Sequence, residues 1–214
     1  GTALADALGL NDVLIEIDNK SLTNRPDLWC HYGIARELSA IYNIELKQPE
    51  LVSIEQKKSK ELSIGISSDD CFRYIGVLVK GVKVGPSPEW LKQRLSAAGV
   101  RSINNIIDLT NYVMLDIGEP MHAFDYEKVG DSIVIRSANA NEELQLLGGE
   151  DIKLKKNNLV IADNKKPIAL AGIKGGEKSS IVDSTNQVIF EAAVFDPLSI
   201  RRTATQLEQR TDAS

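Results

Sequence analysis

The sequence predicts an α+β fold in which strand-rich, mixed sheets are accompanied by a few helices. Short runs of alternating apolar residues follow one another from residue 61 onward, separated by turn signals such as Gly148-Gly149 and Gly175-Gly176. Segments with helical spacing are few, and they do not alternate regularly with those runs. A protein built from βαβ units would show that alternation, so we expect α+β.

The first 50 residues differ from the rest of the chain. Residues 13–17 alternate like a strand, and residues 28–42 have helical spacing. The apolar residues expected to form the buried stripe of that helix are Ile34, Leu38 and Ile41. One strand and one helix cannot bury a core alone. We therefore expect residues 1–50 to be part of a small helical domain whose remainder is missing, and residues 51–60 to be an exposed linker.

Residues 61–214 are expected to form the strand-rich domain. The strands are predicted at residues 62–66, 72–84, 132–136, 143–147, 151–155, 159–162, 167–171 and 187–195. The helices are predicted at residues 88–98, at residues 103–117 and from about residue 198. Ser87 and Ser102 are the expected caps of the first two helices, and Gly99 and Gly118 are expected to end them.

Composition and charge narrow the class of protein. The chain has 214 residues, of which 43% are apolar, so it is long enough to bury a core. A net charge of −5 argues against nucleic-acid binding through overall charge. Cys30 and Cys71 have no metal or disulfide spacing, which favours reduced thiols. Since we see neither a membrane-spanning stretch nor a leader, we expect a cytoplasmic protein with no membrane partner.

The segment from Arg101 to Asp125 places polar side chains where the apolar pattern packs inward. Thr110 and Asn111 lie on helix faces that are otherwise apolar, and such groups need partners that a bound ligand can supply. His122 follows just past the predicted end of the helix. It is either a packed, hydrogen-bonded residue or part of a site. No serine or cysteine has an evident paired base, so a nucleophilic triad has no support.

Glu191 is the one charged residue between Ser184 and Phe195. Both faces of this predicted strand are apolar, so the carboxyl group points into protein whichever way the strand lies. A buried carboxylate costs several kcal/mol unless it is paired or hydrogen-bonded. Two interpretations stay open: a structural carboxylate satisfied by backbone or an arginine, or a ligand-binding group in a mostly apolar pocket.

The loop at residues 171–180, AGIKGGEKSS, is similar to a phosphate-binding loop. Glu177 occupies the place of the second glycine, and an acid there would repel a phosphate. We therefore do not expect a nucleotide site at this loop. Its glycines indicate either a close backbone approach to another group or a plain turn.

Several of these segments together resemble one family. They are IEIDNKSLTNRPDLWCHYGIARELSAIY, RSINNIIDLTNYVMLDIGEPMHAFD, AGIKGG and IRRTATQLEQRTDAS, and they resemble the beta subunit of bacterial-type phenylalanyl-tRNA synthetase. The resemblance spans essentially the whole chain. It implies that residues 61–214 are a tRNA editing domain and that residues 1–50 belong to a helical domain interrupted by an inserted barrel.

The resemblance also implies an activity and a set of site residues. The editing region of the family hydrolyses tyrosine that has been wrongly esterified to phenylalanine tRNA. Its catalytic residues match His122, Thr110 and Asn111, and its substrate-binding residues match Glu191, Ala171 and Gly172. The implied partners are the acceptor end of tRNA(Phe) carrying Tyr and the alpha subunit of a heterotetramer. No metal or cofactor is implied in this region, because ATP and Mg are used elsewhere in the whole synthetase.

Three positions depart from the usual pattern of the family. Glu119 stands where glutamine is frequent, Met121 where leucine is frequent and Lys174 where methionine is frequent. None of the three removes a functional group from the expected site. Two other functions remain open: a non-catalytic tRNA-docking or subunit-assembly module, and a sensor of free amino acids.

Overall fold

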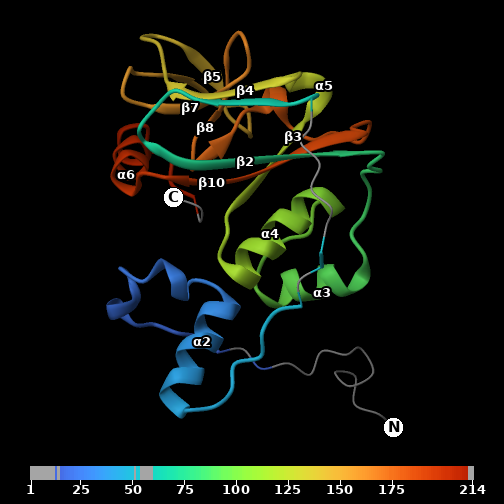
Figure 1. Ribbon diagram of the computed structural model, residues 1–214, viewed down its shortest axis with the longest axis vertical. Coiled ribbons are helices and arrows are strands. Elements are labelled where there is room, and N and C mark those ends of the chain that lie inside the picture. The colour runs from blue at the N-terminus through green and yellow to red at the C-terminus, as the bar shows by residue number, and fades with distance from the viewer. Residues whose placement is uncertain (1–12, 14, 51, 54–59, 212–214) are drawn as a thin grey trace.

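Two facing β-sheets form the main body of the protein (Figure 1). The computed structural model describes residues 13, 15–50, 52–53 and 60–211. The five-stranded sheet contains, in spatial order, β1 (Ser63–Ile66), β4 (Ser132–Ser137), β7 (Leu159–Ala162), β8 (Pro167–Leu170) and β9 (Lys174–Gly175). The three-stranded sheet contains β2 (Cys71–Lys80), β10 (Gln187–Phe195) and β3 (Met121–Asp125). A hairpin of β5 (Glu143–Gln145) and β6 (Asp151–Lys153) completes the strands.

The helices lie outside the two sheets. They are α2 (His31–Tyr42), α3 (Glu89–Ala97), α4 (Asn105–Ile117), α5 (Tyr126–Val129) and α6 (Pro197–Gln206). Short 3-10 turns occupy Lys20–Leu22, Pro26–Leu28 and Glu177–Ser179. β1 and β4 pair in parallel, whereas the other pairs are antiparallel, so the larger sheet is mixed. The predicted α+β class is therefore confirmed.

In the three-stranded sheet, β10 and β3 are buried on both faces over much of their length, whereas the outer face of β2 is exposed at Ile75, Val77 and Val79. The inner face of the sheet packs against the five-stranded sheet through residues such as Phe124 and Ile189. On its outer face, Val188 and Ala123 pack with Ile106 of α4. The layers are thus sheet, sheet and helix, which explains why β10 is apolar on both sides.

The strand β3 was not predicted. The sequence indicated only that α4 ends at Gly118, which is confirmed by its left-handed φ of 80°. The five residues MHAFD show little apolar alternation, and β3 lies at the edge of its sheet. Its pairing with β10 is a long-range contact that local pattern does not reveal.

Both predicted serine caps are wrong. Asn104 caps α4, with its side-chain oxygen 3.0 Å from the amides of Ile106 and Ile107. The hydroxyls of Ser87 and Ser102 both donate to the carboxylate of Asp108 instead. Asp108 is completely buried and needs these donors more than the helix ends do.

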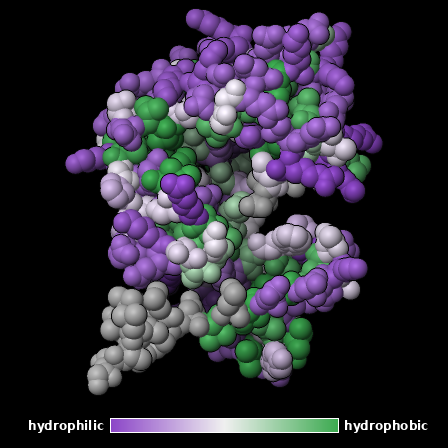
Figure 2. All heavy atoms as spheres, turned by 180° about the vertical axis from the view of Figure 1, so that it is seen from behind, coloured by the Kyte–Doolittle hydropathy of each residue, from purple (hydrophilic) through white to green (hydrophobic). Residues whose placement is uncertain are grey.

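The amino-terminal part differs from its prediction in two respects. Residues 13 and 15–17 are exposed and form no strand, while residues 1–12 and 14 lie outside the described part. The helix begins at His31 rather than near Leu28, and its expected stripe is not buried: Leu38 is 41% and Ile41 64% exposed. Figure 2 shows hydrophobic residues on the surface of this lower part of the molecule. A stripe is buried only if another layer covers it, and the described residues supply none there.

The linker and domain boundaries stay predictions. Of residues 51–60, only 52, 53 and 60 belong to the described part, and none of these three lies in a helix or strand. Within the described ranges, no helix has the length and apolar character needed to span a membrane.

Candidate functional site

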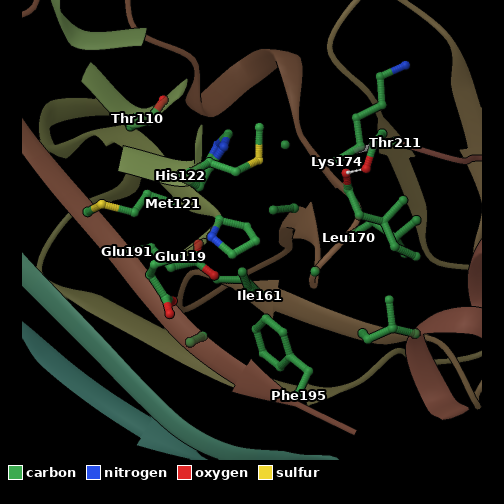
Figure 3. A pocket seen from close by; sticks show the side chains of 18 of the residues that line it. Thr110, Glu119, Met121, His122, Ile161, Leu170, Lys174, Glu191, Phe195 and Thr211 are labelled. Carbon is green, nitrogen blue, oxygen red and sulfur yellow. Dashed lines mark hydrogen bonds between the residues drawn. The ribbon is translucent and has the colours of Figure 1, made fainter. Parts of the chain in front are cut away.

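A cavity of about 730 Å³ opens where the two sheets, the carboxy-terminal part of α4 and the loop after β8 meet (Figure 3). Its walls are mostly apolar, with residues such as Met114, Ile161 and Phe195. Five of the six site residues expected from the sequence line it: Thr110, Asn111, His122, Gly172 and Glu191. A largely apolar pocket with a few convergent polar groups is typical of a small-molecule binding site.

Glu191 and His122 are brought together by strand pairing. They are directly opposite each other in the antiparallel ladder between β10 and β3. Opposed residues of a ladder project from the same face, so both side chains enter the space between the two sheets. Neither Glu191 Oε2 nor His122 Nε2 is solvent-exposed, and neither has a hydrogen-bond partner among the described residues. Buried polar atoms without partners are rare and are candidate contacts for a ligand.

Glu191 is 5% exposed. Burial raises the pKa of the Glu191 carboxyl group to about 8; the Tyr74 hydroxyl opposes the rise and the charge of Glu119 adds to it. The neutral acid therefore predominates at pH 7. Tyr74 lies on β2, close enough to affect the Glu191 carboxyl group. Its buried hydroxyl nevertheless has no well-formed hydrogen bond.

His122 is held as a neutral imidazole. Burial lowers the pKa of His122 to about 4. Its ring packs edge-on against Phe124, with the ring centroids 4.5 Å apart. On another side the ring meets the backbone of Gly175, where an added Cβ would lie 2.3 Å from His122 Cε1. The imidazole is therefore fixed by close packing, with its Nε2 lone pair or proton available to a ligand.

Thr110 and Asn111 approach the cavity from α4. Thr110 is 7% exposed, and its hydroxyl donates to the carbonyl oxygen of Ile107 at 2.8 Å. Because that hydrogen is committed to the helix, the hydroxyl oxygen is free to accept rather than donate. The half-buried Asn111 lines the cavity and carries both an amide donor and a carbonyl acceptor.

The loop after β8 places Gly172 at the cavity and Ala171 behind it. Gly172 has a φ of 65°, and a Cβ on it would lie 3.1 Å from side-chain atoms of Phe195 and of Ile200. The loop is thus both a tight turn and a close backbone approach. Ala171 is 1% exposed and is absent from the cavity wall, and its amide donates to Leu159.

Sequence reasoning missed several residues of the cavity wall as site candidates. Glu119, Lys174 and Arg201 add charged groups, and Gly175 adds the surface under His122. The sequence marked Glu119 and Lys174 only as departures from a family pattern. Within the described part of the chain, no cluster of three or more His, Cys, Asp or Glu side chains is arranged to hold a metal ion.

Comparison with known proteins identifies the family. Residues 70–214 match the family model of the B3/4 domain. The phenylalanine–tRNA ligase beta subunit of Carboxydothermus hydrogenoformans is 46% identical over 219 residues, and that of Fusobacterium nucleatum is 43% identical over 217 residues. Both alignments cover 100% of this chain but 27% of the relative, so the chain spans about a quarter of their length.

A solved structure supports the same fold. An amino-terminal fragment of the phenylalanyl-tRNA synthetase beta subunit from Pyrococcus horikoshii matches 94% of this chain and 65% of that fragment, with a TM-score of 0.51 and 20% identity. The chain therefore belongs to the B3/4 domain family and corresponds to the part of phenylalanine–tRNA ligase beta subunits that carries this domain.

Proposed function

We propose that this chain is the editing region of a phenylalanyl-tRNA synthetase beta subunit and hydrolyses Tyr-tRNA(Phe). The observation that carries the proposal is the buried carboxyl group of Glu191, which has an unpartnered oxygen in the same cavity as His122. The implied substrate end is a tyrosyl ester on the terminal ribose of the tRNA. Family membership supports a role within the synthetase.

Glu191 is suited to select tyrosine over phenylalanine. Tyrosine is the larger by one hydroxyl group, so a site that must spare phenylalanine cannot exclude it by size and has to require the hydroxyl. A bound phenylalanine would leave Glu191 Oε2 buried and unpaired. Sites built on such a hydrogen bond reject the analogue that lacks it by roughly 10⁴-fold. In its neutral form Glu191 can both accept a hydrogen bond from a phenol and donate one to it.

The remaining cavity residues are suited to ester hydrolysis. An aminoacyl ester is already activated, so a full nucleophilic triad is not needed. We assign to His122, Thr110 and Asn111 the positioning of the ester and of a water molecule, with neutral His122 able to take its proton. We assign to the backbone amides around Gly172 the stabilisation of the negative charge that develops on the carbonyl oxygen of the ester.

A subunit-assembly role is the second candidate, and it concerns another part of the chain. Leu38 and Ile41 leave an apolar stripe of α2 exposed, as expected of a helix that packs against a further domain. We expect the whole protein to be cytoplasmic and to form a heterotetramer with the alpha subunit. We expect this heterotetramer to bind the acceptor end of tRNA(Phe). Assembly and editing are compatible, since they use different surfaces.

The deciding experiment measures deacylation of Tyr-tRNA(Phe) and Phe-tRNA(Phe) by the whole synthetase that contains this region. We expect rapid loss of tyrosine and little loss of phenylalanine. Equal rates for both esters, or no rate above spontaneous hydrolysis, would contradict the proposal. The whole enzyme is the right sample because the net charge of −5 predicts weak tRNA binding by the chain alone.

A further inference from the structure

The cavity contains a second carboxyl group that the proposed hydrolysis does not use. Glu119 lies between α4 and β3, three residues before His122, and lines the cavity. Figure 3 shows the side chains of Glu119, His122 and Glu191 gathered on one side of the pocket. Burial raises the pKa of Glu119, and its charge acts on Glu191, so the two carboxyl groups are close.

The charges around Glu119 leave it without a counter-ion. It makes no ion pair among the described residues. Its neighbour His122 is neutral above a pKa of about 4. Lys174 and Arg201 also line the cavity, but neither forms a salt bridge with Glu119. A half-buried carboxylate in such a setting favours a cationic ligand.

A tyrosyl ester presents three polar groups to the cavity: the phenol, the ester carbonyl and the α-ammonium group. The first is assigned above to Glu191, and the second to His122 and the amides around Gly172. The ammonium group is cationic and sits on the carbon that joins the side chain to the ester. In a mostly apolar pocket it needs an anion or several acceptors. Glu119 is next to the residues assigned to the other two groups.

We propose that Glu119 binds the α-ammonium group of the aminoacyl ester and thereby fixes its α-carbon between Glu191 and His122. The inference rests on the proposed function, since it assigns the third polar group of the same substrate. It predicts that the cavity selects free amino groups over acylated ones. A peptidyl or N-formylated ester would leave the Glu119 carboxylate, which accepts a hydrogen bond from the Ala193 amide, without a cationic partner and would be rejected.

The test compares the binding of two amides to the 214-residue chain, so that it does not depend on hydrolysis or on tRNA. L-Tyrosinamide carries the ammonium group, whereas N-acetyl-L-tyrosinamide keeps the phenol and lacks the charge. Titration calorimetry at pH about 6 keeps the amine protonated. We expect the unmodified protein to bind tyrosinamide roughly 10- to 100-fold more tightly, as for a hydrogen-bonded charge.

Glu119→Gln keeps the shape of the side chain and removes the charge. We expect it to abolish the preference by weakening the binding of tyrosinamide alone, while the affinity for N-acetyl-tyrosinamide stays unchanged. Glu127→Gln, at an exposed position on α5, is the matched control and should keep the preference. Circular dichroism spectra and melting temperatures check that both variants are folded.

Three results would overturn the assignment: no preference for tyrosinamide in the unmodified protein, an equal loss of affinity for both amides in Glu119→Gln, or no binding of either amide. Failure of the editing proposal has a different signature. In that case the whole synthetase does not release tyrosine from Tyr-tRNA(Phe), while the preference for tyrosinamide and its loss in Glu119→Gln persist.

Discussion

Glu191 on β10 and His122 on β3 are direct partners in an antiparallel ladder, so the sheet itself sets their separation. Opposed residues in such a ladder have Cβ atoms about 4.5–5.5 Å apart, and both side chains leave the same face. A carboxyl group and an imidazole are therefore held side by side by backbone hydrogen bonds rather than by a flexible loop. Rigid elements of this kind keep a site pre-organised for its ligand.

Replacing Glu191 with alanine should erode the preference for tyrosine. The substitution removes the carboxyl group that we assign to the phenol of tyrosine, a group that phenylalanine cannot satisfy. We expect the ratio of deacylation rates for Tyr-tRNA(Phe) and Phe-tRNA(Phe) to fall roughly 100-fold or more. The ratio of kcat/KM for the two esters, measured in the whole synthetase, checks this. Glu143→Ala, at an exposed strand position, should leave it unchanged. An unaltered ratio in Glu191→Ala would refute the role of Glu191.

Replacing His122 with alanine should slow tyrosine release without changing selectivity. If the imidazole transfers a proton, its removal costs about 10²- to 10⁴-fold in kcat. Because burial lowers the pKa of His122 to about 4, the unmodified rate should stay level above that pH and drop as the pH falls through it. Single-turnover deacylation across pH measures both effects. A profile that bends near the ordinary histidine pKa of about 6.5 would show that the imidazole is not buried during the reaction.

Glu191 should also make the stability of the protein fall with rising pH. Burial raises the pKa of Glu191 from 4.5 to about 8, so its stabilising contribution is complete below 4.5 and is lost as the pH rises toward 8. His122 has the opposite effect, but only below its unfolded value of 6.5. Between pH about 6.5 and 8 only the effect of Glu191 remains, and the free energy of unfolding should fall by an amount on the order of 2 kcal/mol. Urea unfolding at both pH values should show this loss, and Glu191→Gln should remove it.

The sequence predicted the polar residues that line this cavity better than the strands around them. Glu191 was visible because one acid interrupts a long apolar run, and a run of nine residues in β10 survives in the structure as predicted. β3 could not be predicted from local pattern, because its pairing partner β10 lies more than 60 residues away and only that tertiary pairing makes it a strand. The predicted turn at Gly175-Gly176 is wrong, because Gly175 lies in β9 and pairs with Ala169 of β8; its contact with His122 follows from that pairing.

The errors at helix ends have a common cause, which is the buried carboxylate of Asp108. Sequence reasoning treated Ser87 and Ser102 as local caps, because serine is favoured at that position. In the structure both hydroxyls reach Asp108, which also accepts from the Ile103 amide at 2.7 Å. The position of Asp108 on the inner side of α4 depends on how α3 packs, and local spacing does not specify that packing.

Replacing Asp108 with alanine should destabilise the fold. Burial by itself raises the pKa of Asp108, but the hydrogen bonds from Ser102, Ser87 and the Ile103 amide outweigh it, and the net pKa is lowered. Its removal leaves those donors unpaired, at a cost of about 2–4 kcal/mol. Urea unfolding at neutral pH measures the loss. Asp131→Ala, at an exposed position, is the control and should change stability by less than about 0.5 kcal/mol. If Asp108→Ala loses no more stability than Asp131→Ala, the buried carboxylate of Asp108 contributes little to the fold.

Replacing Gly175 with alanine should displace His122 and slow hydrolysis. The new Cβ would lie 2.3 Å from His122 Cε1 and 2.5 Å from His122 Nε2, so the imidazole has to move away from its position in the cavity. A shift of about 1 Å in a catalytic group can reduce a rate roughly 100-fold. Gly65→Ala is the matched control, since Gly65 also lies in a strand of the five-stranded sheet and its nearest neighbour would be 3.9 Å from the new Cβ. We expect Gly65→Ala to keep the deacylation rate, while Gly175→Ala loses it and retains its circular dichroism spectrum. Full activity in Gly175→Ala would mean that the position of His122 is not critical, and hydrolysis would then depend on the other polar groups of the cavity.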